Sequence, residues 1–285
     1  MQREKTTIAK LQAKKINKDP ISALGAYDFF TACLLDEAGI DIVFVGDTVG
    51  VNVLGYRDTR PVTMDEMIHH ARAVGMGGRS AYLVGDMPFL SYHVSPSQAV
   101  RNAGRFIKEA AMDAVKMEGG SEIAPMVKAV ATAGIPVMAH ILYPPPAVHV
   151  PQDSSDKELD RALRFMEDVR ALESAGCFSA VLASVPSDVA RLVTERFSII
   201  TISFGAGPDC DGQALNTWEM LGLTSKPPRP FCKLYVNLGQ QMSQAFQAFR
   251  AEVQAHTFPT TAHSILMDVQ AARALVDELS PDQAE

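Results

Sequence analysis

Acidic side chains stand at the ends of three successive apolar segments of the chain. These residues are Asp47, Asp86 and Glu118. Carboxylates grouped in this way offer hard oxygen ligands, which suit Mg²⁺ because this ion takes few protein carboxylates and keeps several waters. A single acid at such a position could instead cap the following helix, but three at successive segments favour a metal site.

Two nitrogen-bearing side chains accompany these acids. Lys116 precedes Glu118 by two residues, so both point to the same face if the segment is a strand. His140 lies near the end of the next apolar segment. Lys116 is either a counter-ion of the carboxylates or a group that binds an anionic substrate or a developing oxyanion. His140 is either a hydrogen-bonded core residue or part of the pocket lining.

A divalent metal with carboxylates and a lysine favours chemistry on a 2-oxo acid. Mg²⁺ chelated by the carboxylate and keto oxygens of such an acid polarises the carbonyl, acidifies the C3–H and stabilises the enolate. The sequence contains no G-x-S-x-G, H-E-x-x-H or Walker A motif. It therefore disfavours serine hydrolase, zinc protease and P-loop chemistry.

The segments that must position these residues alternate between two kinds. Short apolar runs bounded by turn residues predict strands that are buried on both faces, as in a parallel sheet. Longer stretches with helical periodicity separate them, and Thr63 and Ser95-Pro96 are typical helix starts. The expected strands are 21–27, 41–47, 81–86, 114–118, 136–141, 179–185 and 199–205. The expected helices are 30–38, 64–73, 96–111, 122–133, 157–175 and 187–196.

This alternation predicts an α/β fold, a single (β/α)8 TIM barrel domain over residues 1–285. Seven strand–helix units are followed by a weaker eighth at 212–222, and residues 231–285 form a C-terminal helical tail with its helices before Pro259. The first strand is not followed by G-x-G-x-x-G, which disfavours a dinucleotide-binding sheet. In a (β/α)8 barrel the carboxyl ends of the strands meet at one mouth, so the acidic residues should converge there.

The composition excludes several other classes of protein. The 285 residues are 47% hydrophobic and 21% charged, which is typical of a globular protein. A net charge of −7 disfavours a nucleic-acid partner, and no apolar run approaches the roughly 18–20 residues of a membrane span. The four cysteines fit neither a zinc site nor a disulfide scaffold. Residues 1–18 match no targeting segment, so we expect a cytoplasmic protein with a small-molecule substrate.

Short motifs then recur in a fixed order along nearly the whole chain. They are 6–8 (TTI), 26–28 (AYD), 45–50 (VGDTVG), 54–56 (LGY), 60–63 (RPVT), 85–89 (GDMPF), 101–103 (Arg-Asn-Ala), 114–120 (AVKMEGG), 134–140 (GIPVMAH), 205–212 (GAGPDCDG) and 263–264 (His-Ser). In this order they resemble the ketopantoate hydroxymethyltransferase (3-methyl-2-oxobutanoate hydroxymethyltransferase) family of the phosphoenolpyruvate mutase/isocitrate lyase superfamily.

The resemblance implies a Mg²⁺-dependent TIM barrel of the pantothenate pathway. Family members transfer a hydroxymethyl group from 5,10-methylenetetrahydrofolate to 3-methyl-2-oxobutanoate, and they usually assemble as decamers, so a homo-oligomer is expected. The family's Mg²⁺ ligands match Asp47, Asp86 and Glu118. Its substrate contacts match Asp47, Asp86, Lys116 and Thr48, which replaces the usual serine, and a pocket histidine matches His140.

The chain departs from the family pattern in two main places and one smaller one. Ala183, within 182–186 (LASVP), stands where the family has a glutamate that is its proposed general base. Loss of a positioned base costs about 10²- to 10⁴-fold in rate. The segment 142–156 replaces a glycine-rich loop that borders the substrate, and Phe204 replaces the isoleucine of a Gly-Ile-Gly near the mouth.

Retention of the metal residues beside these changes leaves three hypotheses. The first is a Mg²⁺-dependent aldol-type hydroxymethyltransferase or C–C bond lyase that acts on a 2-oxo acid through a metal-bound enolate. Proton transfer then falls to His140, Tyr143, His149 or a metal-bound hydroxide. The second is a catalytically silent metal- or ligand-binding paralogue. The third is a specialised-metabolism enzyme for a bulkier substrate, with an apolar pocket lined by Ala183, Phe204 and Tyr143.

Overall fold

The computed structural model describes residues 3–143, 158–224 and 227–279. These residues form two compact units, one that extends to Val236 and one that begins at Asn237. None of the described helices is long and apolar enough to cross a membrane.

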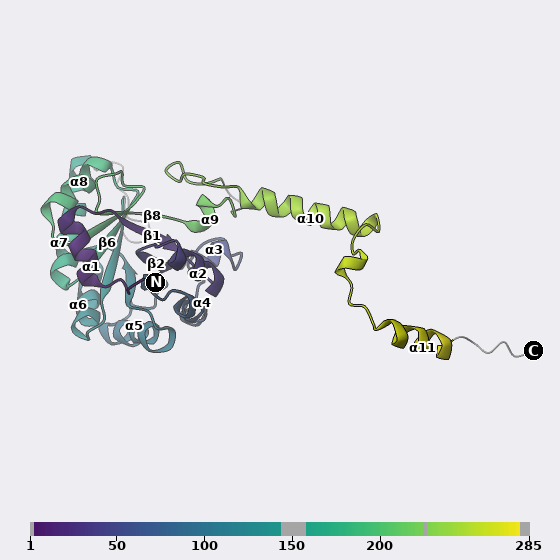
Figure 1. Ribbon diagram of the computed structural model, residues 1–285. Helices are drawn as coiled ribbons and strands as arrows, with labels where there is room; N and C mark the ends of the chain where they lie inside the picture. The colour runs from purple at the N-terminus through teal and green to yellow at the C-terminus, as the bar shows by residue number, and fades with distance from the viewer. Residues whose placement is uncertain (1–2, 144–157, 225–226, 280–285) are drawn as a thin grey trace, which may run out of the picture. The chain divides into compact units, whose positions relative to one another are not determined.

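The first unit is a closed barrel of eight parallel strands in chain order, with helices around it (Figure 1). The ring closes where β1 pairs with β8, with Ile21 opposite Gly212. This confirms the predicted TIM barrel. The strands are β1 (Ile21–Gly25), β2 (Ile42–Val45), β3 (Tyr82–Asp86), β4 (Ala114–Glu118), β5 (Val137–Leu142), β6 (Ser179–Ala183), β7 (Ile200–Phe204) and β8 (Gly212–Leu215).

The helices of this unit lie close to the ranges predicted from periodicity. Helix α4 begins with a reciprocal capping box between Thr63 and Glu66, and α5 begins at Ser95 followed by proline. The helices are α1 (Ile8–Asn17), α2 (Phe29–Glu37), α3 (Val49–Asn52), α4 (Met64–Gly77), α5 (Pro96–Ala110), η1 (Ser121–Ile123), α6 (Ala124–Thr132), α7 (Glu158–Ala175), α8 (Ser187–Arg196) and α9 (Thr217–Met220).

The last strand and helix of the barrel lie within the predicted eighth unit, 212–222. Strand β8 ends at Leu215, because the side chain of Asn216 accepts a hydrogen bond from the amide of Trp218 and starts α9 there. The expected eighth unit over 212–222 therefore contains a four-residue strand followed by a four-residue helix. An asparagine that can cap a helix overrides the apolar residues that follow it.

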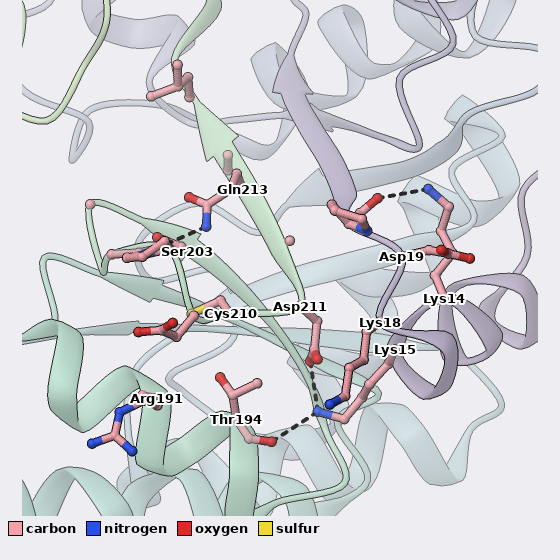
Figure 2. Close-up of a pocket in the computed structure, with 18 of the residues that line it drawn as sticks. Lys14, Lys15, Lys18, Asp19, Arg191, Thr194, Ser203, Cys210, Asp211 and Gln213 are labelled. Carbon is pink, nitrogen blue, oxygen red and sulfur yellow. Dashed lines mark hydrogen bonds and ion pairs between the residues drawn. The ribbon is translucent and has the colours of Figure 1, made fainter.

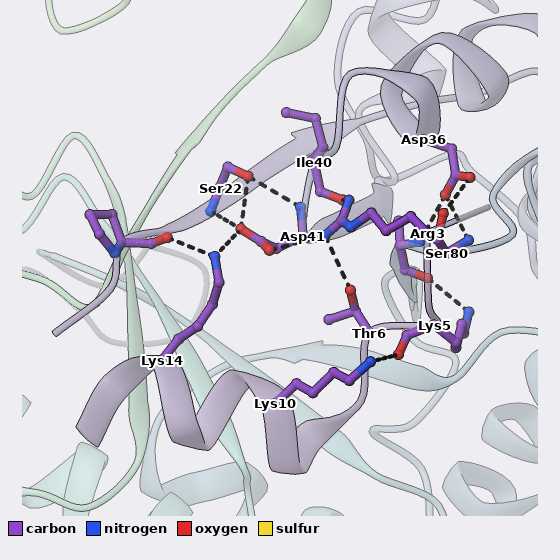
Figure 3. A network of polar contacts seen from close by, with 12 residues as sticks. Arg3, Lys5, Thr6, Lys10, Lys14, Ser22, Asp36, Ile40, Asp41 and Ser80 are labelled. Atoms are coloured by element: carbon purple, nitrogen blue, oxygen red, sulfur yellow. Dashed lines mark hydrogen bonds and ion pairs between the residues drawn. The ribbon is translucent and has the colours of Figure 1, made fainter. Parts of the chain in front are cut away.

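Helix α1 closes the amino-terminal end of the barrel. Leu11 is fully buried in the barrel interior with Ile21 and Ile42. Beside it, Lys14 donates to Asp41 over 2.9 Å, within the polar network that Figure 3 shows. We call this end the floor, and the end where the strands finish the mouth.

The second unit consists of α10 (Leu238–Gln254), η2 (Thr261–His263) and α11 (Val269–Leu279). Neither long helix has a buried residue. On α10, Met242, Phe246, Phe249 and Val253 recur every three or four residues, and all four are exposed. These residues form one apolar stripe along the helix, because such spacing places side chains on one face. Helix α11 was not predicted.

Candidate active site

All six predicted site residues line one pocket at the mouth of the barrel. The pocket has a volume of about 350 Å³. It collects side chains from neighbouring strands because the carboxyl ends of all eight parallel strands meet at this end. The six are Asp47, Thr48, Asp86, Lys116, Glu118 and His140.

A buried ion pair forms the centre of the site. Asp86 and Lys116 are opposite each other in the register of β3 and β4, and Lys116 Nζ lies 2.9 Å from Asp86 Oδ2. Their side chains are only 8% and 12% exposed. Burial alone would lower the pKa of Lys116, but the carboxylates of Asp86 and Asp47 outweigh it and raise that pKa. Lys116 therefore carries a fixed positive charge in the pocket.

Asp47 follows β2 and adds a second carboxylate. Its amide donates to Asp86 Oδ2 over 3.3 Å. Burial and the negative charge of Asp86 raise the pKa of Asp47 to about 7, although Lys116 acts in the opposite direction. The described lining of the pocket thus sets three carboxylates against Lys116, because its other cation, Arg229, pairs with Glu219. This excess of acidic groups favours a bound cation.

Glu118 and His140 are paired across β4 and β5. His140 Nδ1 lies 3.0 Å from Glu118 Oε2, and the two residues are opposite each other in the strand register. Tyr92 holds the backbone of Glu118, since its hydroxyl donates to the Glu118 carbonyl over 2.8 Å. His140 thus contacts the acidic group and belongs to the pocket lining.

The donor set fits a small hard cation such as Mg²⁺. Asp86 Oδ1 is buried and accepts no hydrogen bond within the described chain, so one carboxylate oxygen lacks a partner. Three carboxylates and no thiolate line the pocket, as magnesium prefers. Among the described residues, however, no three His, Cys, Asp or Glu side chains are already grouped tightly enough to ligate one ion. Binding of one ion by all three carboxylates would therefore require a rearrangement of their side chains.

Sequence reasoning missed several residues of the pocket. Tyr27 follows β1 as Asp47 follows β2, and its hydroxyl lies 2.7 Å from Thr48 Oγ1. Asn216 follows β8 and also lines the pocket. Both occupy strand ends, so the rule that singled out the acids would have found them if it had been applied to uncharged residues. Arg229 lines the pocket from beyond α9 and carries no such signal.

Two of the positions that differ from the family pattern, Ala183 and Phe204, are neighbours at the mouth. Ala183 is opposite Phe204 in the register of β6 and β7, and both line the pocket. The Arg229 guanidinium stacks over the Phe204 ring at 5.0 Å, so this side of the pocket is apolar with one cation at its edge. Tyr143 is not among the described residues of the lining: its hydroxyl donates to the Glu158 carbonyl. His149, with residues 144–156 of the altered segment, lies outside the described residues.

Comparison with known proteins places this chain among hydroxymethyltransferases. A family model described as ketopantoate hydroxymethyltransferase matches residues 5–261. The 3-methyl-2-oxobutanoate hydroxymethyltransferase of Syntrophomonas wolfei is 49% identical over 261 residues, which cover 91% of this chain and 95% of that one. The enzyme of the same name from Thermoanaerobacter sp. is 45% identical over 265 residues, 92% and 97% of the two chains.

Solved structures share the fold at much lower sequence identity. Phosphonopyruvate hydrolase in complex with oxalate and Mg²⁺ has a TM-score of 0.60 at 13% identity, with 96% of this chain and 95% of that one covered. A 2,3-dimethylmalate lyase of the phosphoenolpyruvate mutase/isocitrate lyase superfamily has a TM-score of 0.56 at 15% identity, with 96% of each chain covered. These likenesses support the barrel architecture.

Proposed function

The chain belongs to the ketopantoate hydroxymethyltransferase family, and we propose that it transfers a hydroxymethyl group to 3-methyl-2-oxobutanoate in pantothenate biosynthesis. The observation that carries this proposal is the buried Lys116–Asp86 pair beside Asp47 and Glu118 in one pocket. Such a pocket offers one fixed cation for the substrate carboxylate and a set of carboxylates for a metal.

Asp47, Asp86 and Glu118 are the residues that would hold Mg²⁺. The ion, when bound, polarises the keto group of the substrate and makes its C3–H more acidic. The orphaned oxygen of Asp86 and the raised pKa of Asp47 support this assignment, since a cation would neutralise both groups.

The remaining polar residues bind the substrate and move its proton. Lys116 pairs with the negative charge of the substrate and with the oxyanion that develops at the keto oxygen. Ala183 offers no carboxylate, so proton removal falls to His140. If His140 Nδ1–H donates to Glu118, the lone pair on Nε2 remains to accept the C3 proton.

The one-carbon donor would occupy the outer part of the pocket. A volume of about 350 Å³ suits a drug-sized ligand and exceeds what a five-carbon acid needs. Phe204 and Arg229 line this part, so a ligand with a flat ring and an acidic group would find an apolar and a cationic contact. Both features occur in 5,10-methylenetetrahydrofolate, the donor that the family uses.

Proton exchange at C3 of the substrate tests the proposal. In D₂O with the protein and Mg²⁺, the NMR signal of the C3 proton of 3-methyl-2-oxobutanoate should disappear without any one-carbon donor. Lys116→Met should slow the exchange, while Lys108→Met, on the outside of α5, should not. If the signal persists although calorimetry shows that Mg²⁺ binds, the proposed substrate is wrong.

We also propose that the protein is a homo-oligomer in which α10 contacts another copy. A groove of about 1070 Å³ lies outside β7 and β8 (Figure 2), bordered by Arg191 on one side and Lys14 on the other. In this fold a helix normally covers each strand, but after β8 the described chain of this unit supplies only the four-residue α9. Helix α10 has 17 residues, about 25 Å, and an exposed apolar stripe that would cover such a groove.

Light scattering of the full chain tests this assembly. Phe246→Ser with Phe249→Ser should lower the oligomeric mass, because both side chains belong to the stripe. Gln247→Ser, on the same helix but outside the stripe, is the matched control. A wild-type protein that elutes as a monomer would exclude the proposed contact.

A further inference from the structure

A chain of hydrogen bonds leads from α9 to the hydroxyl of Thr48. Asn52 Nδ2 lies 3.5 Å from Asn216 Oδ1 and 3.1 Å from Tyr27 Oη. Tyr27 Oη lies 2.7 Å from Thr48 Oγ1, and either oxygen could be the donor in this last bond. The direction of the chain decides where the Thr48 proton points.

The two asparagines determine that direction. Asn216 Oδ1 accepts the amides of Trp218 and Glu219, at 3.0 and 3.3 Å, as the cap of α9. This end of the Asn216 side chain must therefore be its oxygen. The group of Asn52 that faces this oxygen must then be its NH₂, and the same NH₂ donates to Tyr27 Oη.

Tyr27 consequently donates to Thr48. Among the described residues Tyr27 Oη contacts Asn52 Nδ2, which can only donate, and Thr48 Oγ1, so the single phenol proton points to Thr48 Oγ1. Burial raises the pKa of Tyr27 to about 12, so the phenol keeps this proton at neutral pH. Thr48 Oγ1 then acts as acceptor. Within the described chain no acceptor takes the Thr48 proton, which is left for a ligand in the pocket.

Tyr27 is held by two further contacts, one to its ring and one to its backbone. Its centroid lies 4.4 Å from the ring of Trp218. Its backbone carbonyl lies 2.7 Å from His70 Nδ1, which brings α4 against the same residue. Tyr27 is 4% exposed. A donor fixed in this way loses little conformational freedom when it orients its neighbour.

We propose that Tyr27 is a positioning residue that turns the Thr48 hydroxyl into a hydrogen-bond donor for an anionic oxygen of the substrate. This inference rests on the proposed function, because it takes the substrate to be an acid bound beside Asp47. It requires the site to prefer ligands that accept a hydrogen bond at this position. If Tyr27 only filled space, the site would have no such preference among ligands.

A double-mutant cycle with oxalate as the probe tests the inference. Oxalate is a planar dianion that presents two acceptor oxygens side by side, as the enolate of a 2-oxo acid does. With Mg²⁺ present, Tyr27→Phe and Thr48→Val should each weaken oxalate binding about tenfold by calorimetry, the scale of a hydrogen bond to a charged group. In the Thr48→Val background, Tyr27→Phe should cause no further loss.

Two further variants separate positioning from a structural role. Thr48→Ser keeps a hydroxyl, so it should retain near-wild-type affinity and full sensitivity to Tyr27→Phe. Asn52→Leu removes the donor that directs Tyr27 and should weaken oxalate binding by a smaller factor. Tyr82→Phe is the matched control, since Tyr82 is a buried tyrosine whose hydroxyl contacts Asp113 at the floor. Thermal unfolding of every variant checks that it folds.

The outcomes distinguish this inference from the proposed function. An equal loss from Tyr27→Phe with and without Thr48 would show that Tyr27 does not act through Thr48, and only the inference would fall. If the wild-type protein binds Mg²⁺ but neither oxalate nor 3-methyl-2-oxobutanoate, the proposed function and the inference are both overturned.

Discussion

The carboxylates at the mouth and at the floor of the barrel differ in the direction of their pKa shifts and in their hydrogen-bond partners. At the floor, Asp41 accepts hydrogen bonds from Lys14 and Arg3 and from the amide and hydroxyl of Ser22 (Figure 3). Burial alone would raise the pKa of Asp41, but the bonds from Lys14 and Ser22 lower it overall. At the mouth, burial and Asp86 raise the pKa of Asp47, and Asp86 leaves one buried oxygen without a partner.

This difference separates a stabilising network from a binding site. A carboxylate whose hydrogen bonds are all made contributes to folding, because its charged form is favoured in the native state. A buried carboxylate with missing partners costs folding free energy and is kept where a ligand supplies the partner. In TIM barrels the mouth carries function and the floor carries stability.

The largest expected effect is loss of metal binding at the mouth. Asp86→Ala removes the carboxylate that pairs with Lys116 and offers the unpartnered oxygen, so calorimetry should detect no Mg²⁺ binding. Hydroxymethyl transfer should fall about 10³-fold, the upper range for losing one electrostatic group from an active site. Asp36→Ala, which removes a carboxylate that accepts from Ser80 near the floor, is the control and should bind Mg²⁺ normally. Unchanged binding by the Asp86 variant would refute the metal assignment.

The second effect is loss of stability at the floor. Asp41→Ala leaves Lys14 and Arg3 without their carboxylate partner, although each keeps a backbone carbonyl acceptor, and should lower the free energy of unfolding by about 2 kcal/mol. This is less than the value for a fully buried pair, because both partners are about a third exposed. Urea unfolding measures the loss, and Mg²⁺ binding should not change. Asp188→Ala, at an exposed ion pair, should leave stability unaltered.

A smaller effect is expected from restoring a carboxylate beside the mouth. Ala183→Glu places an acid in the pocket where the resembled family has its proposed base, so ketopantoate formation should rise at least about tenfold. Ala183→Gln has nearly the same size and no basic group, and it should give no gain. Equal rates for the two variants would mean that the altered segment 142–156 limits the reaction.

The smallest effect is on the pH dependence of stability. Asp47 has a folded pKa of about 7 against an ordinary value of 3.8, so its contribution is present at low pH and is lost as the pH rises through about 7. Asp41 has a lowered pKa, so its contribution to stability is present at neutral pH. That contribution is lost as the pH falls through the pKa of Asp41 in the folded protein. The free energy of unfolding of the metal-free protein, measured in urea, should decline less between pH 4 and 7 in Asp47→Asn than in the wild type. If the free energy of unfolding fell with pH as steeply in this variant as in the wild type, the proposed difference between Asp47 and Asp41 would be wrong.

Much of this fold follows from local patterns. Apolar segments that end in Gly or acidic residues mark the strands, and the capping residues Thr63 and Ser95 mark helix starts, because both signals depend on neighbours along the chain. The same patterns marked the weaker eighth unit at 212–222, where the capping Asn216 separates β8 from α9. They did not predict α11, in which no residue is buried and which no core contact requires.

The sequence by itself determined which residues stand at the strand ends and hence which could reach the mouth. Only the tertiary structure decided their partners: Lys116 with Asp86, Glu118 with His140, and Thr48 with Tyr27. Each pair joins different strand ends that are brought together by the register of the closed barrel and by the loops and short helices after its strands. Those arrangements depend on contacts far apart in the chain, so the periodicity of a single segment contains no information about them.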